Sequence, residues 1–249
     1  MKTSKTSNKF ILLAHPRSGS TLLTTYLRSH GQILAHGEVF NESDCDLSPV
    51  TRPDMSKQEL IKERDQDPVK FLSKYVFTND LEWKEIVGFK IHYQHANNGE
   101  KEVWNHLAKD NSIKIIHLTR DNSLETYASL MLAMKTNKWA KINDKPSPRL
   151  TLSLDQQECN YFFNRMEKYR VFYNDLFKNH PILDITYDQL YRNKSNTLEQ
   201  VQQFLEVSME KLDSDLRKQN KTPLPELIEN YDELRRAFEK TRWQHFFSY

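Results

Sequence analysis

The sequence predicts an α/β fold in which helices flank a central parallel sheet in three layers. Along the 249 residues, short apolar runs alternate with longer segments that have the periodicity of amphipathic helices. Strands that alternate with helices favour a parallel sheet, because each crossover returns the chain in the same direction. The first apolar run also passes directly into a Gly- and Ser-containing turn, "HPRSGSTLL" at 15–23, which leads into a helical segment.

Four apolar runs are predicted to be buried strands of this sheet. They are 9–14, 85–93, 113–119 and 181–187. Helical segments are expected at 20–30, 56–77, 99–109, 122–136, 154–179, 195–206 and 226–239. Ligands of such sheets bind beyond the carboxyl ends of the strands, so the residues that follow each run are the first candidates for a site.

Two further segments bear on the organisation of the chain. The Lys- and Pro-rich segment 135–154 lacks periodicity, which indicates a loop that covers a substrate. Aromatic residues at 160–177 have helical spacing, which favours core packing over a sugar-stacking surface. Aromatic residues near the end of the chain also need a place to pack, so we expect one domain over 1–249, with 1–8 flexible.

Composition excludes some classes of function but identifies none. The net charge of +2 is too small to indicate a nucleic-acid partner. Cys45 and Cys159 are far apart and lack metal-ligand spacing, which predicts free thiols in a reducing compartment. The apolar run 10–14 is too short for a signal peptide, and no segment is long enough to insert in a membrane. We therefore expect a cytoplasmic protein, whose oligomeric state the sequence leaves open.

The turn after the first strand has the residues of an anion-binding loop. Glycine lets the backbone approach an anion, hydroxyls add donors, and Arg17 supplies a permanent planar charge. A strand, a loop of this kind and a helix are typical of a P-loop-like fold, although the Gly-Lys-Ser/Thr ending of nucleotide-hydrolysing P-loops is missing. A purely structural turn remains an alternative. The candidate binding residues are Pro16, Arg17, Ser18, Gly19, Ser20, Thr21 and Leu22.

A second candidate follows the third predicted strand. In "HLTRDNSLETYASLMLA", at 117–133, Arg120 comes at the end of the strand and Ser129 lies on the following helix. Both can bind a second phosphate on the ligand side of the sheet. The alternative is a local ion pair between Arg120 and Asp121, with Ser129 as an ordinary residue of the helix surface.

Together these segments resemble the sulfotransferases that use 3′-phosphoadenosine 5′-phosphosulfate (PAPS). "PRSGSTLL" is similar to their 5′-phosphosulfate loop, and "LTRDN…YASLMLA" to their 3′-phosphate element. The resemblance continues in order through "HGEVFN" at 36–41, "GFKIHYQ" at 88–94, "ITYDQLYRNKSNTLEQVQQFLEV" at 185–207 and "ENYDELRRAFEKTRW" at 229–243. It is nearest to the bacterial carbohydrate and natural-product branch, which includes enzymes of the Nod-factor type.

Two features depart from the cytosolic steroid and phenol branch of these enzymes. Arg17 stands where that branch has Lys, and Arg is common at this position in the carbohydrate-acting branches. The spacing from Arg120 to Ser129 is one residue longer than in the steroid and phenol branch.

The resemblance implies PAPS as co-substrate, 3′,5′-adenosine bisphosphate as product, and no metal ion. Arg17, the loop N–H groups and the Ser20 and Thr21 hydroxyls would stabilise the departing phosphate, while Arg120 and Ser129 would hold the 3′-phosphate. Two further cations in a late polar loop, Arg217 and Lys218, either contact the 3′-phosphate or form a solvated surface.

Transfer to a hydroxyl also needs a base, and the sequence offers two candidates. Glu38 follows a predicted strand or turn and resembles the catalytic Glu of the carbohydrate-acting branch. His92 shares one face of a predicted strand with Lys90, and this Lys-x-His resembles that of the steroid and phenol branch. We assign Glu38 as the base, Lys90 as a contact to phosphosulfate, and His92 as a supporting group or alternative base.

The function that the resemblance implies is thus sulfuryl transfer to a small hydroxylated acceptor, carbohydrate-like or a secondary metabolite. Tyr93 and Trp139 are candidates for acceptor contacts. One alternative is a P-loop kinase, for which the loop lacks the required Lys, and the other is a nucleotide-binding protein without catalytic activity.

Overall fold

The computed structural model describes residues 8–78, 84–96, 101–139, 150–216 and 222–248. The chain forms two compact units: Met1–Thr119 with Leu176–Ser214, and Arg120–Asp175 with Asp215–Tyr249. Each unit has its own cluster of buried apolar side chains. Residues 1–7 and the central part of the expected covering loop, 140–149, lie outside the described residues. The single-domain organisation stays a prediction.

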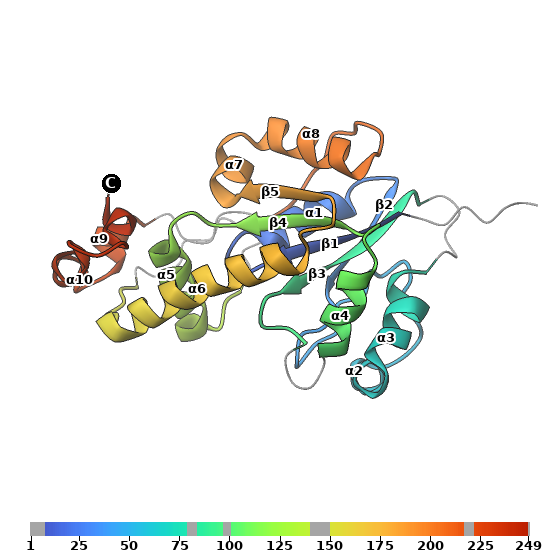
Figure 1. The fold of residues 1–249 in the computed structure, drawn as a ribbon, viewed down its shortest axis with the longest axis horizontal. Helices are drawn as coiled ribbons and strands as arrows, with labels where there is room; N and C mark the ends of the chain where they lie inside the picture. The colour runs from blue at the N-terminus through green and yellow to red at the C-terminus, as the bar shows by residue number, and fades with distance from the viewer. Residues whose placement is uncertain (1–7, 79–83, 97–100, 140–149, 217–221, 249) are drawn as a thin grey trace, which may run out of the picture. The chain divides into compact units, whose positions relative to one another are not determined.

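The first unit is built on a five-stranded sheet in the order β2-β3-β1-β4-β5 (Figure 1). Its strands are β1 (Asn8–Ala14), β2 (Ile33–Glu38), β3 (Ile86–His92), β4 (Lys114–Thr119) and β5 (Ile182–Thr186). All neighbouring strands are parallel, which confirms the predicted sheet. The segment before Glu38, which the sequence left between a strand and a turn, is strand β2.

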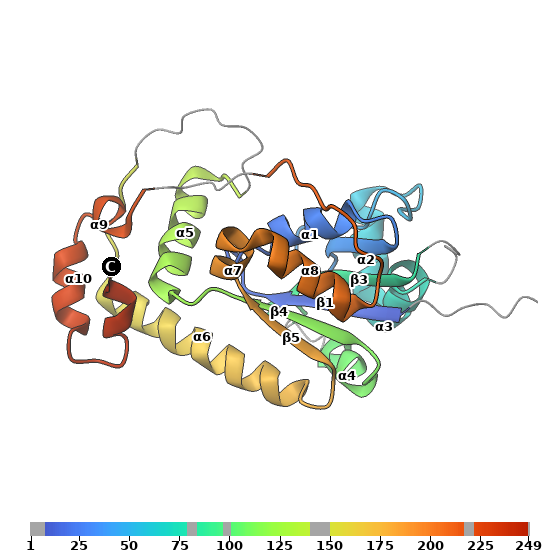
Figure 2. The same cartoon turned by 90° about the horizontal axis from the view of Figure 1, so that it is seen from above.

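Helices cover both faces of this sheet (Figure 2). On one face, α1 (Ser20–Arg28) and α8 (Lys194–Leu205) pack over alternate residues of β1, namely Phe10, Leu12 and Ala14. Helix α4 (Lys101–Lys109) lies on the opposite face. The short helix α7 (Tyr187–Arg192), which the sequence did not predict, connects β5 to α8.

The helix predicted at 56–77 is divided into three segments, α2 (Lys57–Gln66), α3 (Pro68–Phe71) and the π-helical turn η1 (Leu72–Val76). The cause is Pro68, whose ring disfavours a helical conformation in the residue before it. Asp67 accordingly has φ −152° and ψ 84°, which ends α2. Its side chain then accepts a hydrogen bond from the N–H of Lys70, which starts α3.

The second unit contains α5 (Ser123–Thr136), α6 (Gln156–Leu176), α9 (Leu224–Leu227), α10 (Tyr231–Phe238) and the 3₁₀ helix η2 (Gln244–Phe247). Phe163 of α6 packs against Phe238, Trp243 and Phe246, so the aromatic residues near the end of the chain are part of this core.

The prediction that the aromatic residues of α6 pack in the core is only partly right. Phe162, Phe163 and Tyr173 are buried, whereas Tyr161 and Phe172 are exposed by 61% and 58%. The exposed rings lie on the side of α6 away from the core, because the aromatic residues of this segment outnumber the positions on its buried face.

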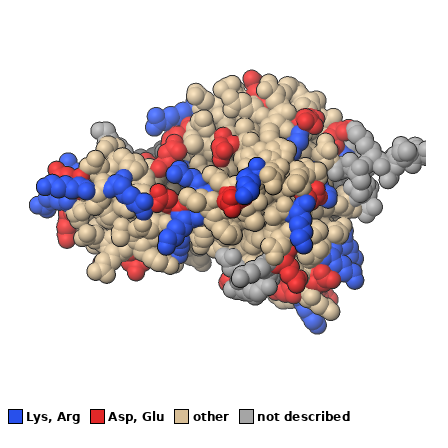
Figure 3. Space-filling view, viewed as in Figure 1, with Lys and Arg blue, Asp and Glu red and all other residues tan. Residues whose placement is uncertain are grey.

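Acidic and basic side chains are interspersed on the face shown in Figure 3, rather than gathered into one basic surface. Among the described residues, no helix has both the length and the apolar character needed to cross a membrane.

Candidate active site

The loop between β1 and α1 is shaped to bind an anion. Arg17 and Gly19 have left-handed backbone conformations, with φ of 72° and 91°. Such a conformation is rare for a residue with a side chain, and strain of this kind concentrates at functional loops. The N–H and hydroxyl of Ser18 both donate to the carbonyl of His15, at 3.3 and 2.7 Å, and so close the turn.

Helix α1 then presents its N-terminus at this loop. Gly19 is the N-cap residue, it makes no side-chain cap, and the first turn contains no acidic residue. The positive end of the helix dipole is therefore not offset by a carboxylate of its own first turn, which favours an external anion. The predicted binding residues 16–22 all lie in this turn and in the first turn of α1.

A bulge in β2 sets the position of Glu38. His36 of β2 lies opposite Phe89 of β3, but Glu38, two residues further, lies opposite Lys90, the next residue of β3. Gly37 is therefore the extra residue, and the bulge places Glu38 in register with Lys90.

The segment after the bulge folds back over β2. The N–H of Gly37 donates to the carbonyl of Asp46 at 2.8 Å. The Asp46 carboxylate in turn accepts two hydrogen bonds of 3.0 Å from Arg28. A Cβ atom at position 37 would lie 1.7 Å from Asp46 Oδ2, so any other residue there would force the Asp46 side chain to move.

Arg64 of α2 is a buried positioning residue that the sequence analysis missed. Its side chain is 4% exposed, and its Nη1 donates to the carbonyls of Val39, Asn41 and Asp44 at 2.8, 2.7 and 2.8 Å. The shape of the chain after Glu38 thus depends on one guanidinium. Asn41, fixed in this way, donates from Nδ2 to Glu38 Oε2 at 2.9 Å.

Lys90 connects the anion-binding loop to Glu38. Its Nζ lies 2.8 Å from Glu38 Oε1 and donates to Thr21 Oγ1 at 3.0 Å, with the Lys90 side chain 4% exposed. One buried ammonium therefore contacts both the first turn of α1 and the candidate base.

His92 lies between the same two elements. Its Nε2 is 3.2 Å from Ser20 Oγ, and its Nδ1 is 3.6 Å from Glu38 Oε2. Both ring nitrogens thus face protein groups, one on the loop and one on the candidate base. The structure therefore brings Glu38, Lys90 and His92 together with the loop, as the sequence analysis required.

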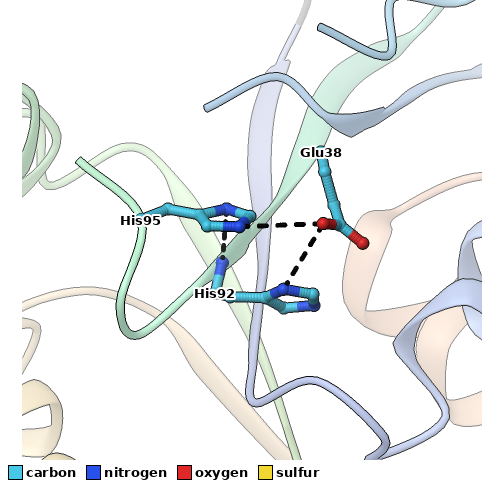
Figure 4. Close-up of side chains that lie close together, drawn as sticks. All are labelled: Glu38, His92 and His95. Atoms are coloured by element: carbon cyan, nitrogen blue, oxygen red, sulfur yellow. Dashed lines mark hydrogen bonds and ion pairs between the residues drawn. The ribbon is translucent and has the colours of Figure 1, made fainter. Parts of the chain in front are cut away.

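His95 is a further residue of this cluster that the sequence analysis missed (Figure 4). A turn after β3, closed by the His95 N–H to the His92 carbonyl at 2.9 Å, places the ring centroids of the two histidines 4.8 Å apart. His95 Nε2 lies 3.7 Å from Glu38 Oε2. The other ring nitrogen, Nδ1, accepts a hydrogen bond from the His92 N–H at 3.3 Å. The only signal in the sequence is a second histidine three residues after Lys-x-His.

The charges of the cluster follow from burial and from the contacts of Glu38 with His92 and Lys90. Burial acts to raise the pKa of Glu38, but the neighbouring His92 and Lys90, together with the hydrogen bond from Asn41, outweigh it and lower the pKa to about 2. Burial lowers the pKa of His92 well below its ordinary value and that of His95 to about 4. At neutral pH the site therefore holds an ionised Glu38 beside two neutral imidazoles, and Lys90 supplies the compensating positive charge.

Glu38, His92 and His95 also form a group whose potential metal-ligand atoms lie within 4.8 Å of one another. Two contacts oppose a metal ion there. His95 Nδ1 already accepts a hydrogen bond, so the proton of the neutral ring is on Nε2, the atom that would have to coordinate the metal. The Lys90 ammonium, 2.8 Å from the same carboxylate, would also repel a cation.

The second predicted phosphate site lies in the other unit. Arg120 is at the start of that unit, its side chain is 11% exposed, and its guanidinium pairs with Glu125 in the first turn of α5. Ser129 is a half-buried residue of α5. Arg217 and Lys218 lie outside the described residues.

The two candidates for acceptor contacts differ in exposure. Tyr93 is 1% exposed, its hydroxyl lies 2.6 Å from His117 Nε2, and its contact with an acceptor stays a prediction. Its ring lies beside those of His15 and His117, with centroids 6.4 and 5.9 Å away. Trp139 is 51% exposed and stays a candidate.

Comparisons with known proteins agree with this geometry. The sulfotransferase domain family model matches residues 7–247. Nodulation protein H of Rhizobium tropici is 28% identical over 96% of this chain and 92% of its own length, and that of Rhizobium meliloti (strain 1021) is 27% identical over 96% and 94%.

Solved structures share the fold. A sulfotransferase from Alicyclobacillus acidocaldarius has a TM-score of 0.53 at 14% identity, over 97% of this chain and 95% of that one. The sulfotransferase domain from the curacin biosynthetic pathway has a TM-score of 0.52 at 16% identity, over 82% and 75%. The anion-binding loop, and the buried lysine and carboxylate on adjacent strands, agree with the match to the family model. Because that model matches nearly all of its length, the chain belongs to the sulfotransferase family.

Proposed function

We propose that this sulfotransferase transfers the sulfuryl group of PAPS to a hydroxyl of a small acceptor, with Glu38 as the general base. The observation that carries the proposal is the contact chain from Thr21 Oγ1 through Lys90 Nζ to Glu38 Oε1, at 3.0 and 2.8 Å. It couples an anion-binding loop to a carboxylate across one side chain. The family match favours this reaction over the kinase alternative.

Each group that we assign to the donor has its own task. Arg17 and the N–H groups at the start of α1 would bind the 5′-phosphosulfate, because a helix N-terminus and a guanidinium both favour a polyanion. We assign the 3′-phosphate to Arg120 and Ser129, with Arg217 and Lys218 as further cations. Binding of that phosphate would require Arg120 to share or exchange its partner Glu125.

Donor binding would also activate the base. A carboxylate with a pKa of about 2 is a weak proton acceptor, and His92 and Lys90 keep the pKa low. When the phosphosulfate binds at the loop, its oxygens compete for the Lys90 ammonium. As that ammonium turns to the donor, burial raises the pKa of Glu38 and makes it a stronger base.

The transfer step then needs few protein groups. The acceptor oxygen attacks sulfur, the bond between sulfur and the bridging phosphate oxygen breaks, and its electron pair leaves with 3′,5′-adenosine bisphosphate. The acceptor proton goes to Glu38. Arg17, Lys90 and the Ser20 hydroxyl stabilise the charge on the leaving phosphate. We assign His92 to hold Ser20 and Glu38 in place, because its two ring nitrogens face those groups.

Calorimetric titration with 3′,5′-adenosine bisphosphate, beside ATP with magnesium, tests the donor assignment. We expect micromolar or tighter binding of the bisphosphate, weak binding of ATP, and a loss of at least about tenfold in affinity in Arg17→Ala and in Arg120→Ala. Arg192→Ala, which removes an arginine exposed by 78%, is the matched control and should bind like the wild type. Preference for magnesium-ATP would contradict the proposal.

A panel of sugars, phenols and aliphatic alcohols with ³⁵S-labelled PAPS tests the transfer itself. We expect a sulfated product with at least one class, and a rate about 100-fold lower in Glu38→Gln at unchanged affinity for the bisphosphate. If His92→Ala abolishes transfer while Glu38→Gln stays active, His92 is the base.

A further inference from the structure

We propose that Glu38 Oε2, His92 Nδ1 and His95 Nε2 form the binding site for the acceptor oxygen, and that His95 donates a hydrogen bond to it. The inference rests on the proposed function and deepens it, because it assigns the groups that position the acceptor oxygen. It also gives a role to His95, whose ring lies beside the candidate base.

The three atoms are spaced to share one oxygen. Oε2 of Glu38 is 3.6 Å from His92 Nδ1 and 3.7 Å from His95 Nε2, and the group lies within 4.8 Å throughout. An oxygen above their plane can therefore lie at a hydrogen-bond distance of about 2.8 Å from all three. Figure 4 shows the carboxylate and the two rings turned toward one another.

The exposure of the three groups gives the direction of entry. The Glu38 side chain is 25% exposed, whereas those of His92 and His95 are 4% and 7% exposed. An acceptor would thus reach the site from the carboxylate side and meet the two rings from there. Trp104 fixes the depth of the His95 turn, because its Nε1 donates to the His95 carbonyl at 3.0 Å.

The hydrogen bond to His95 Nδ1 determines which ring nitrogen carries the proton. Nδ1 accepts the backbone N–H of His92, so it has no proton of its own. The neutral ring must then carry its proton on Nε2, which faces Glu38. His95 is therefore a donor toward the acceptor oxygen and cannot be a second base in this tautomer.

Counting hydrogens and lone pairs leaves one place for His95 in the transfer step. An alcohol oxygen has one hydrogen and two lone pairs. The hydrogen goes to Glu38 Oε2, one lone pair forms the new bond to sulfur, and the other accepts the Nε2–H of His95. The contact with His92 Nδ1 therefore belongs to the bound acceptor before attack and is lost when sulfur takes the second lone pair. The Nδ1 atom of His92 faces Glu38, and its Nε2 atom lies 3.2 Å from Ser20 Oγ.

The same count selects an alcohol over an ammonium group. An ammonium nitrogen has no lone pair for the Nε2–H of His95, so it would leave that buried donor unpaired. A hydroxyl matches one carboxylate acceptor and one imidazole donor at the same time. The site is therefore suited to a neutral alcohol oxygen.

The first experiment locates the proton of His95 in the full chain. A long-range ¹H–¹⁵N spectrum of protein labelled on histidine, recorded at pH 7 and assigned with His95→Gln, should show His95 protonated on Nε2 and unprotonated on Nδ1. A proton on Nδ1, or on both nitrogens, would overturn the proposal.

The second experiment measures sulfuryl transfer from ³⁵S-labelled PAPS to water and to methanol, two probes small enough to need no acceptor-specific loop. His95→Phe keeps a ring but no N–H, and we expect rates at least about tenfold lower. His95→Gln keeps an N–H and should retain more of the rate than His95→Phe. His245→Phe, which makes the same exchange at an exposed histidine, is the matched control and should stay within about twofold of the wild type.

Other results separate this inference from the proposed function. All variants should bind 3′,5′-adenosine bisphosphate with wild-type affinity. If the wild type itself does not bind it, the donor assignment is wrong, whereas the tautomer of His95 is unaffected. Wild-type rates in His95→Phe, or a wild-type rate no higher than that of Glu38→Gln, would overturn the oxygen site. So would micromolar or tighter binding of Zn²⁺ that His95→Gln abolishes, because the three atoms would then be metal ligands.

Discussion

Replacing Lys90 by methionine tests the electrostatic coupling between the anion-binding loop and Glu38. Methionine has a similar length and no charge, so Lys90→Met removes the ammonium 2.8 Å from Glu38 Oε1 and leaves most of the packing. The remaining neighbours of the carboxylate are the two neutral imidazoles and the Asn41 amide. The variant therefore isolates the effect of one charge.

The expected magnitude follows from the pKa of Glu38. Its decrease from 4.5 to about 2 corresponds to about 3 kcal/mol in favour of the ionised form, an upper value because the side chain is 25% exposed. An adjacent cation lowers a carboxyl pKa by about 1 to 3 units. Burial acts in the opposite direction and His92 also lowers this pKa, so without Lys90 we expect the pKa of Glu38 to rise by at least about 1 unit.

The assay is a ¹³C titration of the Glu38 carboxyl by NMR, with Lys74→Met as control, since that residue forms an exposed ion pair with Glu63. The control should leave the pKa of Glu38 near 2. Transfer by Lys90→Met should nevertheless fall by about 100-fold, because the same ammonium is proposed to stabilise the phosphosulfate. A pKa that stays near 2 in Lys90→Met would refute the assignment of the charge to Lys90.

Three further predictions concern stability. Gly37→Ala should lower the free energy of unfolding by about 1–3 kcal/mol in denaturant titrations, because its Cβ overlaps Asp46 Oδ2, whereas Gly31→Ala, which meets only the end of the flexible Glu210 side chain at 3.2 Å, should be tolerated. Equal stability of the two variants would contradict the role of the bulge. Arg64→Met should cost at least about 2 kcal/mol, since three carbonyls lose a donor, and a melting temperature like that of the exposed-residue control Arg52→Met would refute this. Burial lowers the pKa values of His36 and His95 to about 4, so between pH 6.5 and 4 the unfolded chain binds more protons than the folded one. The free energy of unfolding should therefore fall as the pH decreases across that window, by about 1.4 kcal/mol per pH unit for each residue. A stability that is constant from pH 7 to pH 5 would exclude this account.

The sheet could be predicted from the sequence because its strands are continuous apolar runs. Strands β1, β3, β4 and β5 all fall within the predicted runs, apart from Asn8 at the start of β1. Their order was not predictable, because strand order depends on which crossovers pass over which face, and no local pattern encodes that choice. The division of the helix at 56–77 could have been predicted, since Pro68 marks its position.

The site was predictable where local periodicity determines it and not where irregular backbone does. Lys90 and His92 lie on one face of a strand because alternate residues do. The contact between Lys90 and Glu38 depends on the bulge at Gly37, which the sequence shows only as a glycine. His95 reaches the cluster through a turn, so its position cannot be predicted from strand periodicity.

Arg64 could not have been found in this way either. Its three acceptors are backbone carbonyls, which have no sequence signature, and α2 is distant in sequence from the segment that it holds.

The contact between Lys90 and Glu38 has a consequence for the order in which substrates add. Until a donor occupies the loop, the base is held by an ammonium and has little tendency to take a proton. An acceptor that arrives first would meet an inactive carboxylate, whereas one that arrives after the donor would meet a free one. Initial-rate kinetics should therefore show compulsory addition, with PAPS first. The acceptor should suppress transfer of the sulfuryl group to water only after the complex with PAPS has formed.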